Sequence, residues 1–432
     1  MDLKKWILIK KICFVLLTLF FTPQWTLATQ NNLGERFTID SSLLNETRQF
    51  QVVLPENYHA DSSTNYPVLY LLDGDYLLHG ASGMLDLLAN KGQLIPDIIV
   101  VGLADKGTDK YRQYMTPQGL SAPRKQGDMG KASEFLAHIN EELIPYIEAN
   151  YRTADNEIIF GHSIGGLFVL NALLESPNTF NRYFSSSPSV WLNDYAFVKR
   201  AKKVMAESQH DPVSLYLSLG DETRMGQYGF IDVLDDLQPK NIDWHFTHYP
   251  NENHVSVALI SLRNSLKHTF DGWFIAEKEL NKIRSADDII AHYRPLLASF
   301  NIKQAIPTPS VRAAIRYFYR NEKQADIGAF MQKVKQELPS SEAAFVMMLA
   351  SYRGHFDAPQ AGIELLLSKE ASFSHSIEYM KAIAVAYDKA GNDKLSLDYY
   401  QKALDLSKKQ NANQWQVNII EAKLLQMSKM TQ

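Results

Sequence analysis

The sequence predicts an α/β fold, in which a doubly wound and mostly parallel sheet is followed by an all-helical repeat region. Up to about residue 275, short apolar runs alternate with longer stretches whose apolar residues recur at helical spacing. Beyond residue 276, glycine becomes rare and strand-like alternation stops. The chain has 432 residues, enough for two or three domains, with 45% hydrophobic and 21% charged residues. We therefore expect three segments, at residues 1–28, 29–275 and 276–432.

The expected strands follow one another through the first large segment. Polar and apolar residues alternate between residues 37 and 54, which indicates two antiparallel edge strands. Continuous apolar runs at 66–72 and 97–103 are typical of strands buried on both faces. An amphipathic helix is expected over residues 131–150 and an apolar helix over 167–174. The remaining strands are predicted at residues 158–160, 183–187, 213–219 and 243–248.

The helical segment carries signs of a repeat. Residues 377–407 divide into two helices around residues 389–392. Tyr387, Gly391 and Ala403 occupy positions where a 34-residue helix-turn-helix repeat places its packing residues. Residues 343–369 form a weaker copy, and residues 411–430 are expected to form a closing helix. An ordinary helical bundle without repeat ancestry is the alternative.

The N-terminus has the layout of a secretory signal peptide. Four lysines among the first eleven residues precede an apolar run at 12–21, and Thr26-Leu27-Ala28 forms a small-residue cleavage site. We therefore expect export to the periplasm or the medium, with an uncleaved anchor as the alternative. The single cysteine, Cys13, lies in this segment. The mature chain then has no disulfide, no cysteine nucleophile and no cysteine metal site.

Residues 161–165, with the sequence GHSIG, fit the G-x-S-x-G pattern between a predicted strand and a predicted helix. A serine in so tight a turn has close neighbours, and Gly161 and Gly165 leave out side chains that would clash. The turn presents the Ser163 hydroxyl above the sheet. It also directs the amide of Ile164 at the place where an oxyanion would form. A glycine-rich turn with an incidental serine is the alternative.

A serine needs a base to take its proton, and in hydrolases with this turn the chain order is serine, acid, histidine. His254 is the favoured base because it follows the last predicted strand and precedes a helix-like run. His245 and His248 are rivals, but both lie within that strand, where a packed or exposed sheet histidine is expected.

The acid is expected in the loop after the strand at 213–219, where Gly220 is followed by two carboxylates. We favour Glu222 and keep Asp221 as its rival. Asp232 and Asp235 lie further along a helix-like stretch and are weaker candidates.

The second oxyanion donor is expected in the loop at residues 73–76, where Gly74 permits a close backbone approach. The amide of Asp75 or of Tyr76 would point at the oxyanion. The substrate pocket is set by loops, and Trp191, Met225 and Tyr228 are candidates for its lining.

Residues 37–273 resemble the putative-esterase family of α/β hydrolases, which includes enterochelin esterases, S-formylglutathione hydrolases, feruloyl esterases and mycolyltransferases. The resemblance is carried by seven segments. They are YPVLYLLDGDY at 66–76, RQYMTP at 112–117, ELIPYIEANYRT at 142–153, FGHSIGG at 160–166, SSSPSVWLND at 185–194, LSLGDE at 217–222 and ENHVSV at 252–257.

The resemblance implies Ser163 as nucleophile, His254 as base, a carboxylate after Gly220 and an oxyanion hole in the 73–76 loop. Members of the family often carry a second acidic residue where this chain has Thr223, so Asp221 and Glu222 both stay open. The C-terminal segment is similar to tetratricopeptide repeats over at most two units.

We therefore expect a serine hydrolase that cleaves a small-molecule carboxylic ester through an acyl-enzyme on Ser163, with no metal or organic cofactor. One alternative is a non-catalytic scaffold whose helices bind a protein partner, and another is an acyltransferase. The net charge of −4 and the lack of a basic patch interleaved with aromatic residues argue against a nucleic-acid partner. No membrane span is expected after signal cleavage.

Overall fold

The computed structural model describes residues 34–56, 58–59, 63–120 and 129–430, and residues Leu33–Gln432 form one compact unit. The expected signal peptide and Cys13 lie outside the described residues. Among the described residues, no helix combines the length and the apolar character needed to cross a bilayer.

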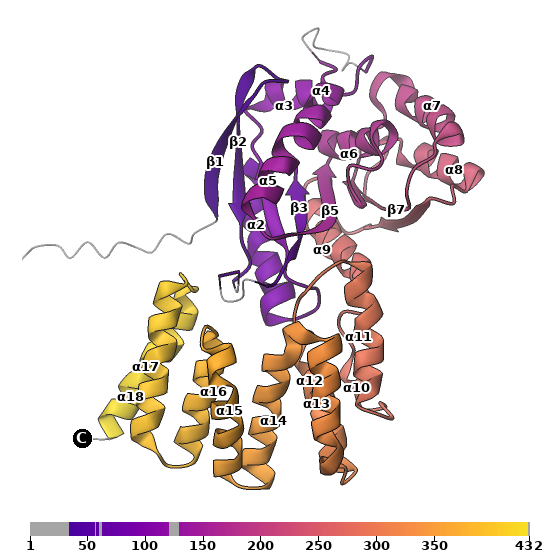
Figure 1. The fold of residues 1–432 in the computed structure, drawn as a ribbon. Coiled ribbons are helices and arrows are strands. Elements are labelled where there is room, and N and C mark those ends of the chain that lie inside the picture. Colours follow the sequence, from indigo (N-terminus) through magenta and orange to yellow (C-terminus); the bar gives the residue numbers. More distant parts are fainter. Residues whose placement is uncertain (1–33, 57, 60–62, 121–128, 431–432) are drawn as a thin grey trace, which may run out of the picture. The chain divides into compact units, whose positions relative to one another are not determined.

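Within the described residues, eight strands form one sheet in the order β1-β2-β4-β3-β5-β6-β7-β8 (Figure 1). Strand β2 runs antiparallel to both β1 and β4, and the remaining neighbours are parallel. The predicted mostly parallel sheet is therefore confirmed, although β2 lies inside the sheet and only β1 of that pair is an edge strand. The strands are β1 (Glu35–Ser41), β2 (Glu46–Val53), β3 (Tyr66–Leu71), β4 (Ile99–Leu103), β5 (Thr153–His162), β6 (Arg182–Ser186), β7 (Val213–Leu219) and β8 (Ile242–His248).

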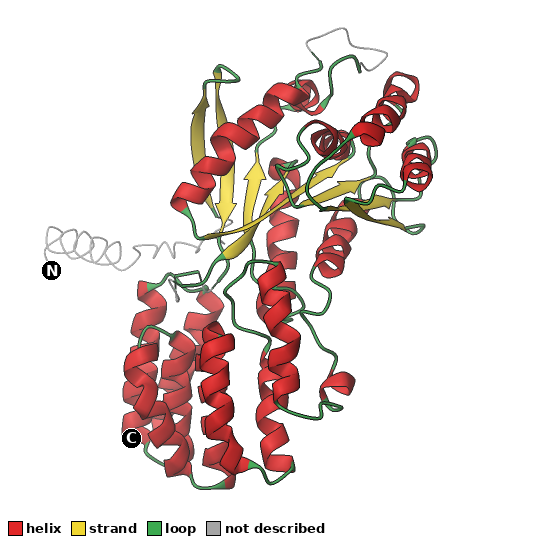
Figure 2. Cartoon of the chain, turned by 45° about the vertical axis from the view of Figure 1, so that its right-hand side comes forward, coloured by secondary structure: helices red, strands yellow, loops and turns green. Residues whose placement is uncertain are grey.

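Helices cover both faces of the sheet (Figure 2). Residues that alternate along one strand enter different cores, as β5 shows: Ile159 joins one cluster, and Ile158 and Phe160 join the other. The first face packs against α3 (Thr108–Met115), α4 (Ala132–His138), α5 (Ile144–Asn150), α6 (Ile164–Glu175), α7 (Leu192–Glu207) and α8 (Gln227–Leu237). The second face packs against α2 (Gly74–Leu85), η1 (Asp86–Lys91) and α9 (Val257–Thr269).

The helix expected over residues 131–150 is present but is not a uniform α-helix. A wider π-helical stretch, η2 (Ile139–Leu143), joins α4 to α5. Pro145 follows it in the first turn of α5. Proline has no N–H to give to the carbonyl four residues earlier, so a regular α-helix is interrupted at this point.

After α9 the described chain is helical, as predicted. Two of its glycines have distinct roles, one at a close contact between helices and one at a positive φ. A Cβ at Gly362 would lie 2.5 Å from the carbonyl oxygen of Ala350 on the neighbouring helix, and Gly391 ends a helix with a φ of 73°. The elements are α10 (Glu277–Leu280), α11 (Asp287–Ser299), α12 (Thr308–Arg320), η3 (Gln324–Asp326), α13 (Ile327–Glu337), η4 (Pro339–Ser341), α14 (Glu342–Phe356), α15 (Pro359–Phe373), α16 (Ile377–Lys389), α17 (Asp393–Lys409) and α18 (Gln414–Met430).

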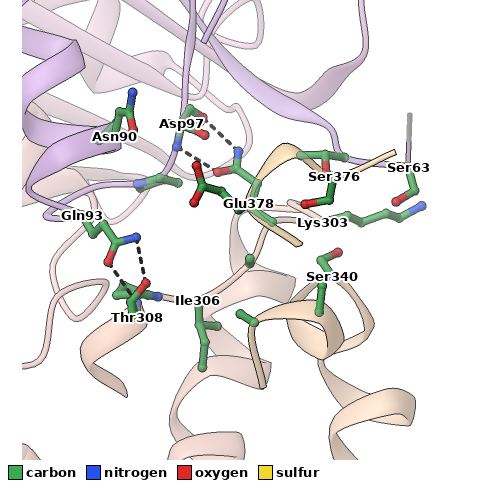
Figure 3. A pocket seen from close by; sticks show the side chains of 18 of the residues that line it. Ser63, Asn90, Gln93, Asp97, Lys303, Ile306, Thr308, Ser340, Ser376 and Glu378 are labelled. Atoms are coloured by element: carbon green, nitrogen blue, oxygen red, sulfur yellow. Dashed lines mark hydrogen bonds between the residues drawn. The ribbon is translucent and has the colours of Figure 1, made fainter. Parts of the chain in front are cut away.

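A seam joins the amino ends of β3 and β4 to the segment at residues 301–308, which leads into α12. The buried side chain of Gln304 accepts a hydrogen bond from the amide of Asp97 (2.8 Å) and donates to the carbonyls of Asp97 (2.9 Å) and Asn65 (3.1 Å). Gln93 and Thr308 form two further bonds across the seam (Figure 3). A cavity of about 690 Å³ lies here. Ser163 follows the carboxyl end of β5, so this cavity lies at the opposite edge of the parallel strands.

Candidate active site

Ser163 lies between the end of β5 and the start of α6 in a strained conformation, with φ 57° and ψ −115°. The positions two residues before and two residues after Ser163 have room only for glycine. A Cβ at Gly161 would lie 2.3 Å from the carbonyl oxygen of Gly165, and one at Gly165 would lie 2.7 Å from the Tyr111 hydroxyl. The Ser163 amide donates to the carbonyl of Ser186 at 2.9 Å, which holds the turn against the next strand.

Two hydrogen bonds connect Ser163 to a histidine and a carboxylate from later in the chain. The Ser163 Oγ lies 2.9 Å from Nε2 of His254, and His254 Nδ1 lies 2.7 Å from Oε2 of Glu222. His254 lies in the loop between β8 and α9, and Glu222 lies in the loop after β7. If Nδ1 donates to Glu222, Nε2 is left as the acceptor for the serine proton. The structure thus brings the favoured base and the favoured acid to Ser163.

Glu222 rather than Asp221 faces His254. Its other oxygen, Oε1, accepts a hydrogen bond from the buried Ser187 hydroxyl at 2.8 Å, and that hydroxyl accepts one from the Gly220 amide at 3.2 Å. Asp221 is exposed, and its backbone amide donates to the carbonyl of Glu252 at 2.6 Å.

The rival residues lie elsewhere. His245 is on β8, where its ring stacks on that of His268 with centroids 4.4 Å apart. His248 is the exposed last residue of β8. Asp232 and Asp235 belong to α8.

The loop at residues 73–76 lies against the serine turn, because a Cβ at Gly165 would be 3.1 Å from Oδ2 of Asp73. Helix α2 begins at Gly74, so the Asp75 amide lies in its first turn, where no intrahelical acceptor is available. The Tyr76 amide instead donates to the carbonyl of Asp73 at 3.0 Å. The geometry therefore favours the amide of Asp75 over that of Tyr76 as an oxyanion donor, alongside the amide of Ile164 at the start of α6.

Asp73 is a buried acid beside this loop. Burial raises the pKa of its carboxyl to about 7, and the nearby Tyr111 hydroxyl partly offsets that rise. Burial and the neighbouring Asp73 also raise the pKa of Tyr111 well above its ordinary value.

Two more side chains contact the site, and the sequence pattern did not single out either of them. Ser189 places its hydroxyl 3.3 Å from Oγ of Ser163. His162, the residue just before the serine, brings its Nε2 within 2.5 Å of the backbone carbonyl of His254. Burial, with a smaller contribution from His254, lowers the pKa of His162 to about 4. His162 stands at a variable position of G-x-S-x-G, where the pattern gives no sign of a contact with the base. Ser189 belongs to the segment at 185–194, which was noted only because it resembles the esterase family.

Of the residues expected to line a substrate pocket, Trp191 and Met225 are on loops, and Tyr228 is in the first turn of α8. Trp191 is 38% exposed, Tyr228 is 54% exposed and Met225 is half-buried. A Cβ at Gly226 would lie 2.7 Å from the Tyr195 ring and 3.2 Å from the Trp191 amide, so the loops after β6 and β7 touch. The Tyr228 ring packs edge-on against Phe246. Among the described residues, no three histidine, cysteine or acidic side chains are grouped to hold a metal ion.

This sheet order, with a serine turn after β5, an acid after β7 and a histidine after β8, defines a hydrolase of the α/β class. Residues 41–236 match the Esterase family, described as "Putative esterase", and this part of the chain is an esterase domain of the α/β-hydrolase type.

Known proteins resemble the chain over different lengths. The ferri-bacillibactin esterase BesA of Bacillus subtilis is 26% identical over 274 residues, which are 56% of this chain and 94% of BesA. The crystal structure of an IroE-like serine hydrolase from Shewanella oneidensis is 26% identical, with a TM-score of 0.57 over 72% of this chain and 99% of that one. An uncharacterised protein from Capnocytophaga ochracea, 17% identical, shares the fold over 91% of this chain and 99% of its own, with a TM-score of 0.54. The chain is an ester hydrolase.

Proposed function

We propose that the chain is a serine esterase in which Ser163 is the nucleophile, His254 the general base and Glu222 the acid that steadies the base. The observation that carries this proposal is the chain of two hydrogen bonds, 2.9 Å from Ser163 to His254 and 2.7 Å from His254 to Glu222. The strained serine turn supports it, because the hydroxyl is held at the start of a helix with no side chain on either flanking glycine.

The mechanism follows from this geometry. Ser163 Oγ attacks the ester carbonyl while Nε2 of His254 takes its proton, and Glu222 stabilises the resulting imidazolium. The amides of Ile164 and Asp75 hold the oxyanion, and losing one such donor typically raises the barrier by about 3 kcal/mol. His254 then gives its proton to the leaving alcohol, and water hydrolyses the acyl-enzyme.

The substrate that we propose is a small siderophore ester, with Trp191 and Tyr228 among its contacts. The match to the ferri-bacillibactin esterase supports this class, and it spans most of that protein. Ferri-bacillibactin, iron-free bacillibactin and a simple nitrophenyl ester should be compared as substrates by chromatography. The proposal requires that at least one of the two siderophores is turned over faster than the nitrophenyl ester.

We further propose that residues 1–28 direct export and are removed, that residues 29–275 form the catalytic domain, and that residues 276–432 form a tetratricopeptide-like domain that binds a protein partner. The paired helices α14–α15 and α16–α17, with Gly391 at the turn of the second pair, support the last part.

Ser163→Ala tests the nucleophile. It removes the attacking oxygen, so hydrolysis of a nitrophenyl ester should fall by about 10⁴-fold or more, and labelling by a fluorophosphonate probe should stop. The alanine variant should unfold at the same urea concentration as the wild type. Full activity in this variant would exclude Ser163, and a wild-type protein that resists the probe would favour a non-catalytic scaffold.

A further inference from the structure

We propose that His162 is a positioning residue for the base: its imidazole donates a hydrogen bond to the backbone carbonyl of His254 and fixes the loop that presents the base to Ser163. This inference rests on the proposed roles of Ser163 and His254. It assigns a function to the variable residue of the G-x-S-x-G turn.

The contact joins a central strand of the sheet to a loop. His162 is the last residue of β5, a central strand that pairs with β3 on one side and β6 on the other. His254 lies in a loop, and its ring is 39% exposed. The Nε2 atom of His162 lies 2.5 Å from the carbonyl oxygen of His254, across 92 residues of sequence. The same residue that precedes the nucleophile is therefore bonded to the residue that carries the base.

Other hydrogen bonds also hold this loop, among them the one at 2.6 Å from the Asp221 amide to the carbonyl of Glu252. The Tyr249 amide donates to the carbonyl of Leu219 at 2.8 Å, before the histidine. The side chain of the adjacent Asn253 accepts from the amides of Val255 (2.9 Å) and Ser256 (3.0 Å), which lie between His254 and α9. The bond from His162 acts on the peptide of His254 itself. Its loss would free the imidazole to move relative to Ser163, where an error of about 1 Å costs on the order of 10²-fold in rate.

The chemistry of the two groups fixes the direction of the bond. A carbonyl only accepts, so Nε2 of His162 carries the proton. The ionisable groups that face His162 are the imidazole of His254, the carboxylate of Glu222 and, at its backbone amide, the carboxyl of Asp73. Burial and the proximity of His254 lower the pKa of His162 to about 4, so the ring is neutral at pH 7. A neutral donor holds the loop without opposing the positive charge that His254 gains during catalysis.

The test compares His162→Ala, which removes the donor, with His162→Gln, whose Nε2–H can replace it. We expect His162→Ala to lower kcat for a nitrophenyl ester by about 10- to 100-fold with KM changed less than twofold, and to slow fluorophosphonate labelling equally. His162→Gln should recover most of both rates.

His292→Ala is the matched control, because His292 makes the same kind of bond, 2.7 Å from Nε2 to the carbonyl of Gly272, in the helical region. It should leave kcat unchanged. Equal kcat in His162→Ala and wild type, or a loss that His162→Gln does not recover, would overturn the positioning role. If Ser163→Ala kept full activity, the proposed function would fail instead, and the two failures are therefore distinguishable.

A pH series gives an independent readout. The pKa of His162 is about 4 in the folded chain and about 6.5 in the unfolded chain. As the pH falls, the imidazole is therefore protonated in the unfolded chain before it is protonated in the folded chain. The contribution of His162 to stability is complete above pH 6.5 and is lost as the pH falls toward 4. The free energy of unfolding of the wild type should therefore fall more steeply over this range than that of His162→Gln. Equal slopes would show that His162 is not held neutral.

Discussion

At the scale of single residues, two adjacent carboxylates in the loop after β7 have different surroundings. The Asp221 amide is tied to the carbonyl of Glu252, and its side chain is exposed. The Glu222 carboxylate is mostly shielded from solvent and is shared between His254 and Ser187. A carboxylate that orients a catalytic imidazole needs both features, because it must be fixed in place and must accept the Nδ1 proton.

Substituting the two carboxylates separately tests this difference. Glu222→Gln should lower kcat for a nitrophenyl ester by about 10³- to 10⁴-fold, because an amide can hold His254 in the wrong tautomer. Asp221→Asn should keep kcat within twofold of the wild type. Steady-state kinetics of both variants provide the measurement. The reverse order of effects would move the acid to Asp221.

The sequence could predict those site residues whose positions depend on local pattern or on chain order, and it could not predict those that depend on tertiary contacts. Ser163 could be predicted because its turn requires glycine at fixed spacing. The proximity of His254 to Ser163 could be predicted because chain order and strand ends limit which histidines can reach the serine turn. Ser187, Ser189 and His162 contact the site only through neighbours that the fold brings together, so local pattern gave no sign of them. The choice between the amides of Asp75 and Tyr76 likewise depended on where α2 begins.

At the scale of elements, the serine turn joins β5 to α6 with almost no free space. The strands around it were predictable because parallel strands buried on both faces leave continuous apolar runs in the sequence. The π-helical stretch η2 was not, because apolar spacing over 131–150 fits one amphipathic helix. The glycines of the turn have a steric role that can be tested apart from catalysis.

Gly161→Ala should destabilise the fold by about 3 kcal/mol or more, because its Cβ would lie 2.3 Å from the backbone carbonyl oxygen of Gly165. Gly83→Ala is the matched control within helix α2. A Cβ there meets nothing within 4 Å, and alanine favours a helix by up to about 1 kcal/mol. Urea unfolding of both variants measures the difference. A Gly161→Ala protein as stable as Gly83→Ala would mean that the turn is less constrained than its geometry indicates.

At the scale of the whole molecule, the helical segment shares a core with the sheet. One hydrophobic cluster runs from Leu71 of β3 through Leu262 of α9 to Val311 of α12 and Phe345 of α14. The change in sequence character near residue 275 therefore marks a change of secondary structure within a continuous core. Because the seam around Gln304 lies at the amino ends of the strands, it does not cover the serine turn at their carboxyl ends.

Gln304→Ala tests how strongly the seam couples the two regions. Gln304 is buried, and its loss leaves the amide and carbonyl of Asp97 without their partner, at a cost of about 1–3 kcal/mol. Gln360→Ala is the control: it removes an exposed glutamine that bonds only Glu364 among the contacts described, and it should change the free energy of unfolding by less than about 0.5 kcal/mol.

Since the shared core couples sheet and helices, we expect the wild type to unfold in one transition by circular dichroism and by tryptophan fluorescence. Gln304→Ala should lower the midpoint and leave kcat unchanged, because the seam is remote from Ser163. Unchanged stability in this variant, or separate transitions for sheet and helices in the wild type, would mean that the two regions fold independently.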